Sequence, residues 1–139
     1  MPVCHLMKRI VFILLSLCSI ASCDPVKNVL ISNQTDKDVK VVIVQNATRQ
    51  FSLGSGQQTQ IELKKSGELA NKRFSYGLGK FSKGELNLFN SSIQQIIIVS
   101  KNDSCVVEGD GLKDFLPKKR IGVYNSTIEL KILNCPPSK

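Results

Sequence analysis

Cysteine carries most of the reactive chemistry in this chain of 139 residues, and its five copies fall into two groups. Cys4, Cys18 and Cys23 lie near the beginning, whereas Cys105 and Cys135 lie near the end. A cysteine thiol can act as a nucleophile, bind a metal or carry a lipid, and a pair of cysteines in an exported protein forms a disulfide. The residues around the first group decide among these roles.

The residues before Cys23 have the three parts of a secretory signal peptide. Lys8 and Arg9 are basic, residues 10–21 are mainly apolar, and small residues precede Cys23. The apolar stretch is shorter than the roughly 20 residues that a membrane-spanning helix needs. We therefore predict that residues 1–22 are a signal peptide and are removed from the mature chain.

Residues 20–23 read Ile-Ala-Ser-Cys, an aliphatic residue and two small residues followed by cysteine. This segment resembles the lipobox of bacterial lipoproteins, and the resemblance covers only the signal peptide. It implies that Cys23 is linked to diacylglycerol and becomes the mature N-terminus. Asp24 is similar to the residue that retains enteric lipoproteins in the inner membrane. The resemblance thus implies a lipid-anchored protein that faces the periplasm.

A second interpretation is ordinary cleavage near Cys23, which would release a soluble secreted binding or inhibitor domain. Asn-x-Ser/Thr triplets favour this alternative, because they are N-glycosylation sites in eukaryotic secreted proteins. In a bacterium the same triplets are turn chemistry, and all of them fall in predicted turns. They begin at Asn33, Asn46, Asn90, Asn102 and Asn125.

The predicted mature chain contains no histidine, because the only one is His5. This excludes Ser-His-Asp and Cys-His catalytic arrangements and histidine-ligated metal sites. We predict no metal, cofactor or small-molecule substrate, and a protein that is not an enzyme; a hydrolase that uses carboxylates alone is the minor alternative. Loss of Lys8 and Arg9 lowers the formal net charge of +8 by two, which leaves a mild positive excess.

Cys105 and Cys135 are the cysteines that remain once Cys23 is assigned to the lipid. An even pair in an exported domain is expected to form a disulfide, and two buried free thiols are the alternative. We predict that this bond joins the last strand to a strand near the middle of the fold.

Short apolar stretches separated by turn residues indicate an all-β domain. The pattern predicts about 8–10 strands in a small antiparallel β-sandwich or barrel, formed by residues 29–139 after a lipidated cysteine and short tether at 23–28. A short helical turn is expected at 112–116, and 93–99 is expected in the centre of a sheet. The expected strands are 26–32, 39–44, 49–53, 59–64, 73–78, 85–89, 93–99, 104–108, 120–124 and 127–133.

Two basic segments are candidate contact surfaces. The first contains Lys72, Arg73, Lys80 and Lys83, interleaved with aromatic residues. It is interpreted as a solvated strand face with aromatic residues in the core, or as a contact for anionic lipid headgroups or another polyanion; nucleic acid is the least favoured partner.

The second basic segment contains Lys118, Lys119 and Arg120, beside the long loop 109–119. It is either a solvated run that flanks a strand or a protein contact with Phe115 and Leu116 as apolar anchors. Together these features predict a lipid-anchored envelope protein that binds or scaffolds other envelope proteins without catalysis.

Overall fold

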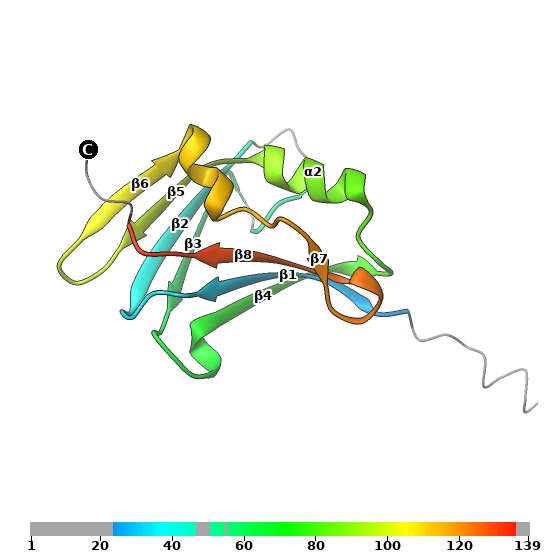
Figure 1. The fold of residues 1–139 in the computed structure, drawn as a ribbon, viewed down its shortest axis with the longest axis horizontal. Coiled ribbons are helices and arrows are strands. Elements are labelled where there is room, and N and C mark those ends of the chain that lie inside the picture. Colours follow the sequence, from blue (N-terminus) through cyan, green and yellow to red (C-terminus); the bar gives the residue numbers. More distant parts are fainter. Residues whose placement is uncertain (1–23, 47–50, 55, 136–139) are drawn as a thin grey trace, which may run out of the picture.

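The computed structural model describes residues 24–46, 51–54 and 56–135, which form two four-stranded β-sheets packed face to face (Figure 1). The predicted signal peptide 1–22 and lipidation site Cys23 lie outside the described residues. Sheet A has the strand order β4-β1-β8-β7, and sheet B has the order β3-β2-β5-β6. Of the predicted sandwich or barrel, the structure has the sandwich, with eight strands in the described part of the chain.

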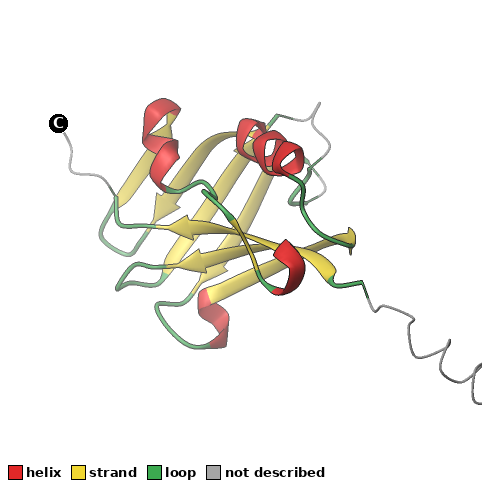
Figure 2. Ribbon diagram, turned by 45° about the vertical axis from the view of Figure 1, so that its right-hand side comes forward, coloured by secondary structure: helices red, strands yellow, loops and turns green. Residues whose placement is uncertain are grey.

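The eight strands match most of the expected segments in position. They are β1 (Val26–Asn33), β2 (Val39–Gln45), β3 (Gln58–Leu63), β4 (Asn71–Leu78), β5 (Ile93–Val99), β6 (Ser104–Glu108), β7 (Arg120–Ile121) and β8 (Thr127–Ile132). The helical segments lie at the margins of the two sheets (Figure 2); they are the α-helix α2 (Lys83–Ser92) and the 3-10 turns η1 (Glu68–Ala70), η2 (Gly109–Asp114) and η3 (Val123–Asn125).

The first and last strands of the sandwich are neighbours in sheet A. β1 and β8 pair in parallel, with Asn28 opposite Thr127 and Asn33 opposite Ile132. All other strand pairs are antiparallel, so the predicted antiparallel arrangement holds except at this one pair. Because β1 begins at Val26, it starts inside the segment 23–28 that was expected to be a tether.

The hydrophobic core lies between the two sheets and follows the alternation of the strands. β5 lies between β2 and β6, which confirms the prediction that residues 93–99 occupy a sheet centre. Each fully buried aliphatic side chain stabilises the fold by about 1.5–3 kcal/mol. The strand residues of this core are Val29, Ile31, Val39, Val41, Ile43, Ile61, Leu63, Ile93, Ile96, Ile98, Val107, Ile128, Leu130 and Ile132.

The predicted strand over 85–89 is wrong, because these residues lie in the helix α2. Ser82 caps the helix: its hydroxyl accepts a hydrogen bond from the Glu85 amide at 3.0 Å, and the Glu85 carboxylate accepts one from the Ser82 amide at 2.7 Å. This capping box starts a helix in which Phe89 is buried. The helix then carries the chain from sheet A to sheet B.

The predicted strand over 49–53 is also wrong for its described part, Phe51 to Leu53, which is not in a strand; residues 47–50 lie outside the described residues. Both antiparallel neighbours of β2 are other strands, β3 and β5. The buried Gln45 side chain provides the hydrogen bonds that a paired strand would otherwise make with residues 51–53. Its Nε2 donates to the Phe51 carbonyl at 3.0 Å, and its Oε1 accepts from the Leu53 amide at 2.8 Å.

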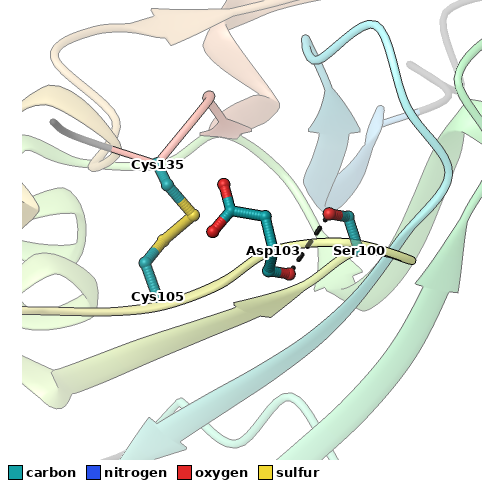
Figure 3. The surroundings of a disulfide bond; sticks show 4 residues. All are labelled: Ser100, Asp103, Cys105 and Cys135. Atoms are coloured by element: carbon teal, nitrogen blue, oxygen red, sulfur yellow. Dashed lines mark hydrogen bonds between the residues drawn. A yellow bond between two sulfur atoms is a disulfide. The ribbon is translucent and has the colours of Figure 1, made fainter.

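Cys105 and Cys135 form the predicted disulfide, with a sequence separation of 30 residues (Figure 3). Cys105 lies on β6, an edge strand of sheet B, and Cys135 follows β8 of sheet A. The bond therefore joins the two sheets, although its partner strand is at an edge and not in the middle of the fold. Beside it, the Ser100 hydroxyl donates to the Asp103 carbonyl at 3.1 Å in the β5–β6 turn.

We predict that the double variant Cys105→Ala, Cys135→Ala is less stable than the wild type by on the order of 3–4 kcal/mol, because the unfolded chain is no longer closed into a 30-residue loop. Urea denaturation measures the difference. A reducing agent should lower the stability of the wild type by a similar amount and leave the variant unchanged. An unchanged midpoint in the variant would contradict this role of the disulfide.

Candidate functional site

A groove of about 470 Å³ lies between β8 and the segment that leads into β7; we call it the β8 groove. Buried residues of β8 alternate with Glu129 and Lys131, which therefore point away from the core. Apolar side chains of Leu116, Ile121 and Leu133 line the groove together with charged ones. The complete lining is Asp114, Phe115, Leu116, Lys118, Lys119, Ile121, Glu129, Lys131 and Leu133.

Three hydrogen bonds hold the segment 115–121 in place, in addition to the pairing of β7 with β8. The Phe115 carbonyl accepts from the Lys131 amide at 3.1 Å, and the Pro117 carbonyl accepts from the Asn90 side chain of α2 at 3.0 Å. The Arg120 guanidinium donates to the Phe81 carbonyl at 2.9 Å. Exposed Lys118 and Lys119 lie between these fixed points, so a firm backbone presents both lysines to solvent.

The two predicted apolar anchors have different positions. Phe115 is 4% exposed and belongs to the core, so its ring does not project as a surface anchor as expected. Leu116 is half-buried and lines the groove. The reason is the η2 turn, which directs Leu112 and Phe115 inward. The predicted helical turn at 112–116 therefore begins earlier, at Gly109.

A second groove, of about 400 Å³, lies on the other side of the two lysines; we call it the basic groove. Four cationic side chains line it and no carboxylate does. Lys118 and Lys119 are shared with the β8 groove and form a ridge between the two. The complete lining is Lys83, Leu86, Asn87, Lys118, Lys119, Arg120 and Asn125.

The ion pairs at this site are long, and the pair between Lys118 and Asp114 is exposed. Lys118 lies 3.4 Å from Asp114, and Lys131 lies 4.0 Å from Glu129. Exposed pairs of this kind contribute at most about 1 kcal/mol. Lys83 and Lys119 form no ion pair with any carboxylate in the described ranges. Lys83 and Lys119 are therefore available to a negatively charged partner, and only a weak exposed pair engages Lys118.

The structure divides the predicted basic residues among different surfaces. Lys83 comes together with Lys118, Lys119 and Arg120 in the basic groove. Lys72 and Arg73 are exposed on β4, which is the edge of sheet A opposite to β7. Lys80 lies in the loop between β4 and α2. The two predicted basic segments therefore do not form one continuous surface.

The aromatic residues of the first basic segment pack inward. The Tyr76 ring lies 5.5 Å from the Phe51 ring, and its hydroxyl donates to the Ser52 carbonyl at 2.8 Å. Burial raises the pKa of Tyr76 to about 12, so the hydroxyl stays a donor at neutral pH. Phe74 also packs against the core. Neither ring is presented as a stacking platform beside Lys72 and Arg73.

The carboxylates of the β8 groove are engaged by neighbouring groups. Asp114 and Glu129 share the β8 groove, but each lies close to a lysine and Glu129 also accepts a hydrogen bond from Ser32 at 2.7 Å. This is not the desolvated carboxyl pair that a glycosidase uses. Within the part of the chain that is described, no three potential metal ligands come together.

Sequence reasoning found the lysine ridge but missed the surfaces around it. Glu129 and Lys131 alternate with apolar residues in the sequence 127–133, which is consistent with an outer strand face, but nothing in this pattern indicates that segment 115–121 lies beside them. Leu86 and Asn87 were assigned to a strand, although Ser82 and Glu85 have the spacing of a capping box. That spacing is the feature that would have identified α2.

No family model matches the chain, and no curated protein or solved structure matches it. Among the described residues, none of the helices has the length and apolar character needed to cross a bilayer.

Lys27 and Glu85 join the beginning of β1 to the beginning of α2. The Lys27 ammonium lies 2.6 Å from the Glu85 carboxylate and 5.7 Å from the centre of the Phe81 ring. The Lys27 hydrogen bond, followed by the Ser82 amide, lowers the pKa of Glu85 below its usual value. This pair fixes the helix that carries Lys83 into the basic groove.

We predict that Glu85→Gln lowers the free energy of unfolding at pH 7 by about 1 kcal/mol, as expected for loss of a capping interaction. Because the folded protein lowers the pKa of Glu85, its carboxylate stabilises the fold above the unfolded pKa of about 4.5. This contribution fades as the pH falls further, so the difference between the two proteins should shrink at pH 3.

Urea denaturation at pH 7 and pH 3 measures this difference. Glu62→Gln, an exposed change on β3, is the matched control and should have little effect at either pH. A Glu85→Gln difference that is equal at both pH values would contradict the assigned role.

Proposed function

We propose that this protein is a bacterial envelope lipoprotein that is anchored through acylated Cys23 and faces the periplasm. In this proposal it binds or scaffolds other envelope proteins without catalysis. The lipobox-like residues 20–23 support the anchor. With this anchor the folded domain would lie close to the bilayer, since β1 begins at Val26. Anchoring would raise the effective concentration of the domain near membrane partners.

The binding surface that we propose is the pair of grooves on either side of the lysine ridge. The observation that carries the proposal is the basic groove, which four cations line without a carboxylate. The adjacent β8 groove adds Leu116, Ile121 and Leu133. Charge complementarity therefore favours an acidic protein segment that also carries an apolar residue. The cations would speed its association by electrostatic attraction, and the apolar residue would be buried in the β8 groove.

The Asn-x-Ser/Thr triplets give less support to a glycosylated secreted protein than their number suggests. Asn33 is 7% exposed, and its amide donates to the Lys37 carbonyl at 2.8 Å and the Lys64 carbonyl at 2.9 Å. The Asn90 amide donates to Pro117. A glycan would be attached to these same nitrogens, so both asparagines are better explained by structural hydrogen bonds.

We predict that intact mass spectrometry of the mature protein finds an acylated N-terminal Cys23, and that Cys23→Ser abolishes both the acyl mass and membrane retention. Cys18→Ser, which changes a cysteine inside the predicted signal peptide, is the matched control and should leave the acyl mass unchanged. An unmodified mature chain that starts near Asp24 would contradict the lipoprotein proposal and favour the secreted alternative.

We predict that a photo-crosslinking residue at Asn87, which lines the basic groove, forms an adduct in cells with an acidic segment of an envelope protein. Double charge reversal, Lys83→Glu with Lys119→Glu, should weaken capture by roughly tenfold, equivalent to about 1.4 kcal/mol.

The matched control is Lys72→Glu with Arg73→Glu on the opposite edge of sheet A, which should leave the adduct unchanged. Sequencing of the crosslinked peptide identifies the chemistry of the partner. If the adduct persists in the Lys83→Glu, Lys119→Glu variant but is lost in the Lys72→Glu, Arg73→Glu variant, the binding surface lies on β4 and the proposal is contradicted.

A further inference from the structure

The end of the sandwich at which β1 begins brings three segments together. The Gly79 amide donates to the Pro25 carbonyl at 2.7 Å, and the Phe81 amide donates to the Asn125 carbonyl at 3.0 Å. Residues 79–81 therefore bridge the start of β1 and the η3 turn. In Figures 1 and 2 the η3 turn and the start of β1 lie at the same end of the molecule, away from the C-terminal end.

This end is rich in exposed apolar side chains. Of the eight large apolar residues that are exposed in the described chain, four lie here, and Val26 and Leu78 are register partners. Together with exposed Lys80, which lies between the Val26–Leu78 pair and the η3 turn, these four residues form what we call the anchor-end face. Its apolar members are Val26 (45% exposed), Leu78 (67%), Val123 (67%) and Tyr124 (75%).

The η3 turn holds its most exposed side chain in an unusual backbone conformation. Tyr124 has φ 53° and Asn125 has φ 58°, both in the left-handed region. Left-handed backbone costs roughly 1–2 kcal/mol for a residue with a side chain, and asparagine tolerates it better than tyrosine. Because Tyr124 is 75% exposed, its ring recovers little packing energy in the sandwich. Backbone hydrogen bonds support this strained turn, but packing of the Tyr124 ring does not, which makes the ring a candidate for an external contact.

Hydrogen bonds keep this turn in place. The Asn125 amide donates to the Gly122 carbonyl and the Ser126 amide to the Val123 carbonyl, both at 3.2 Å. Together with the bond from Phe81, they fix the direction in which Val123 and Tyr124 project. The face is therefore built before any partner arrives, and a partner gains contact without the cost of ordering a loop.

The charges at this end suit an anionic surface. Lys80 is exposed and pairs with no described carboxylate, and Lys83 lies at the nearby start of α2. The carboxylate of Glu85 is paired with Lys27, which leaves Asp24 as the opposing charge beside the start of β1. Basic residues near an anionic membrane contribute about 1 kcal/mol each, and tyrosine favours the boundary between headgroups and acyl chains.

We propose that the anchor-end face contacts the bilayer, with Leu78, Val123 and Tyr124 inserted among the lipid headgroups and Lys80 paired with their phosphates. This inference rests on the proposed acylation of Cys23. Three Cα steps of about 3.8 Å separate Cys23 from Val26, so the start of β1 lies within about 11 Å of an acylated cysteine. An anchor this short brings this end, and not the disulfide end, to the membrane.

The test places one added cysteine at a time in the full chain and labels it with an environment-sensitive fluorophore. Leu78→Cys and Tyr124→Cys report on the face, and Val106→Cys, an exposed apolar position on β6, is the matched control. The purified mature protein is reconstituted in vesicles of phosphatidylethanolamine and phosphatidylglycerol. Intact mass establishes acylation of the same samples, and circular dichroism establishes folding.

Labels at positions 78 and 124 should shift to shorter emission wavelengths and lose quenching by aqueous iodide, whereas the label at position 106 should do neither. Lys80→Glu should reduce the shift in these vesicles, and Lys101→Glu, in the turn between β5 and β6, should not. Acylated protein with all three labels fully quenched would overturn the contact face but leave the anchor intact. If intact mass shows no acyl chains, the proposed lipid anchor is contradicted. If the labels at positions 78 and 124 of such protein are also unprotected from iodide, the contact face is overturned as well.

Discussion

The parallel pairing of β1 with β8 is the constraint on which the rest of this structure depends. It places the first and last strands of the sandwich side by side in the centre of sheet A. Since both strands run in the same direction, the loop before β8 must lie at the end where β1 starts. The end of β4 reaches the same place because β4 is antiparallel to β1. One end of the molecule therefore brings together the start of β1, the η3 turn and residues 79–81.

The two ends of the sandwich have different chemistry as a result. The end where β1 starts carries exposed apolar side chains and Lys80, and the opposite end carries the disulfide between the sheets. Between them, the lysine ridge lies along the side of sheet A beside β8. An anchor at Cys23 would hold the first end on lipid while the grooves stay open to the periplasm. The basic groove, which contains Lys83 and Asn125, would then open close to the membrane.

Local patterns in the sequence predicted most strands, the sandwich and the disulfide. Alternation over 127–133 and the apolar stretch 93–99 were sufficient because each has one clear period. The errors came where two patterns compete. Leu86 and Leu88 alternate like a strand, but the Ser82–Glu85 capping box made the segment helical. The sequence placed Phe115 in the long loop 109–119, but the η2 turn directs its ring into the core. The grooves and the anchor-end face depend on which segments become neighbours, and no local pattern encodes that.

The central claim is that the anchor-end face rests on the bilayer and the disulfide end points away from it. Energy transfer between the disulfide end and the bilayer tests this claim most directly. A donor placed in the turn between β5 and β6, by Lys101→Cys, and an acceptor on the lipid headgroups would report the height of this end above the membrane. The eight residues of β1 span about 26 Å at about 3.3 Å per residue. Our account predicts that the donor at position 101 lies at least about this far above the headgroups, much farther than a donor at position 80. Equal transfer from both positions would contradict an upright domain that rests on its anchor end.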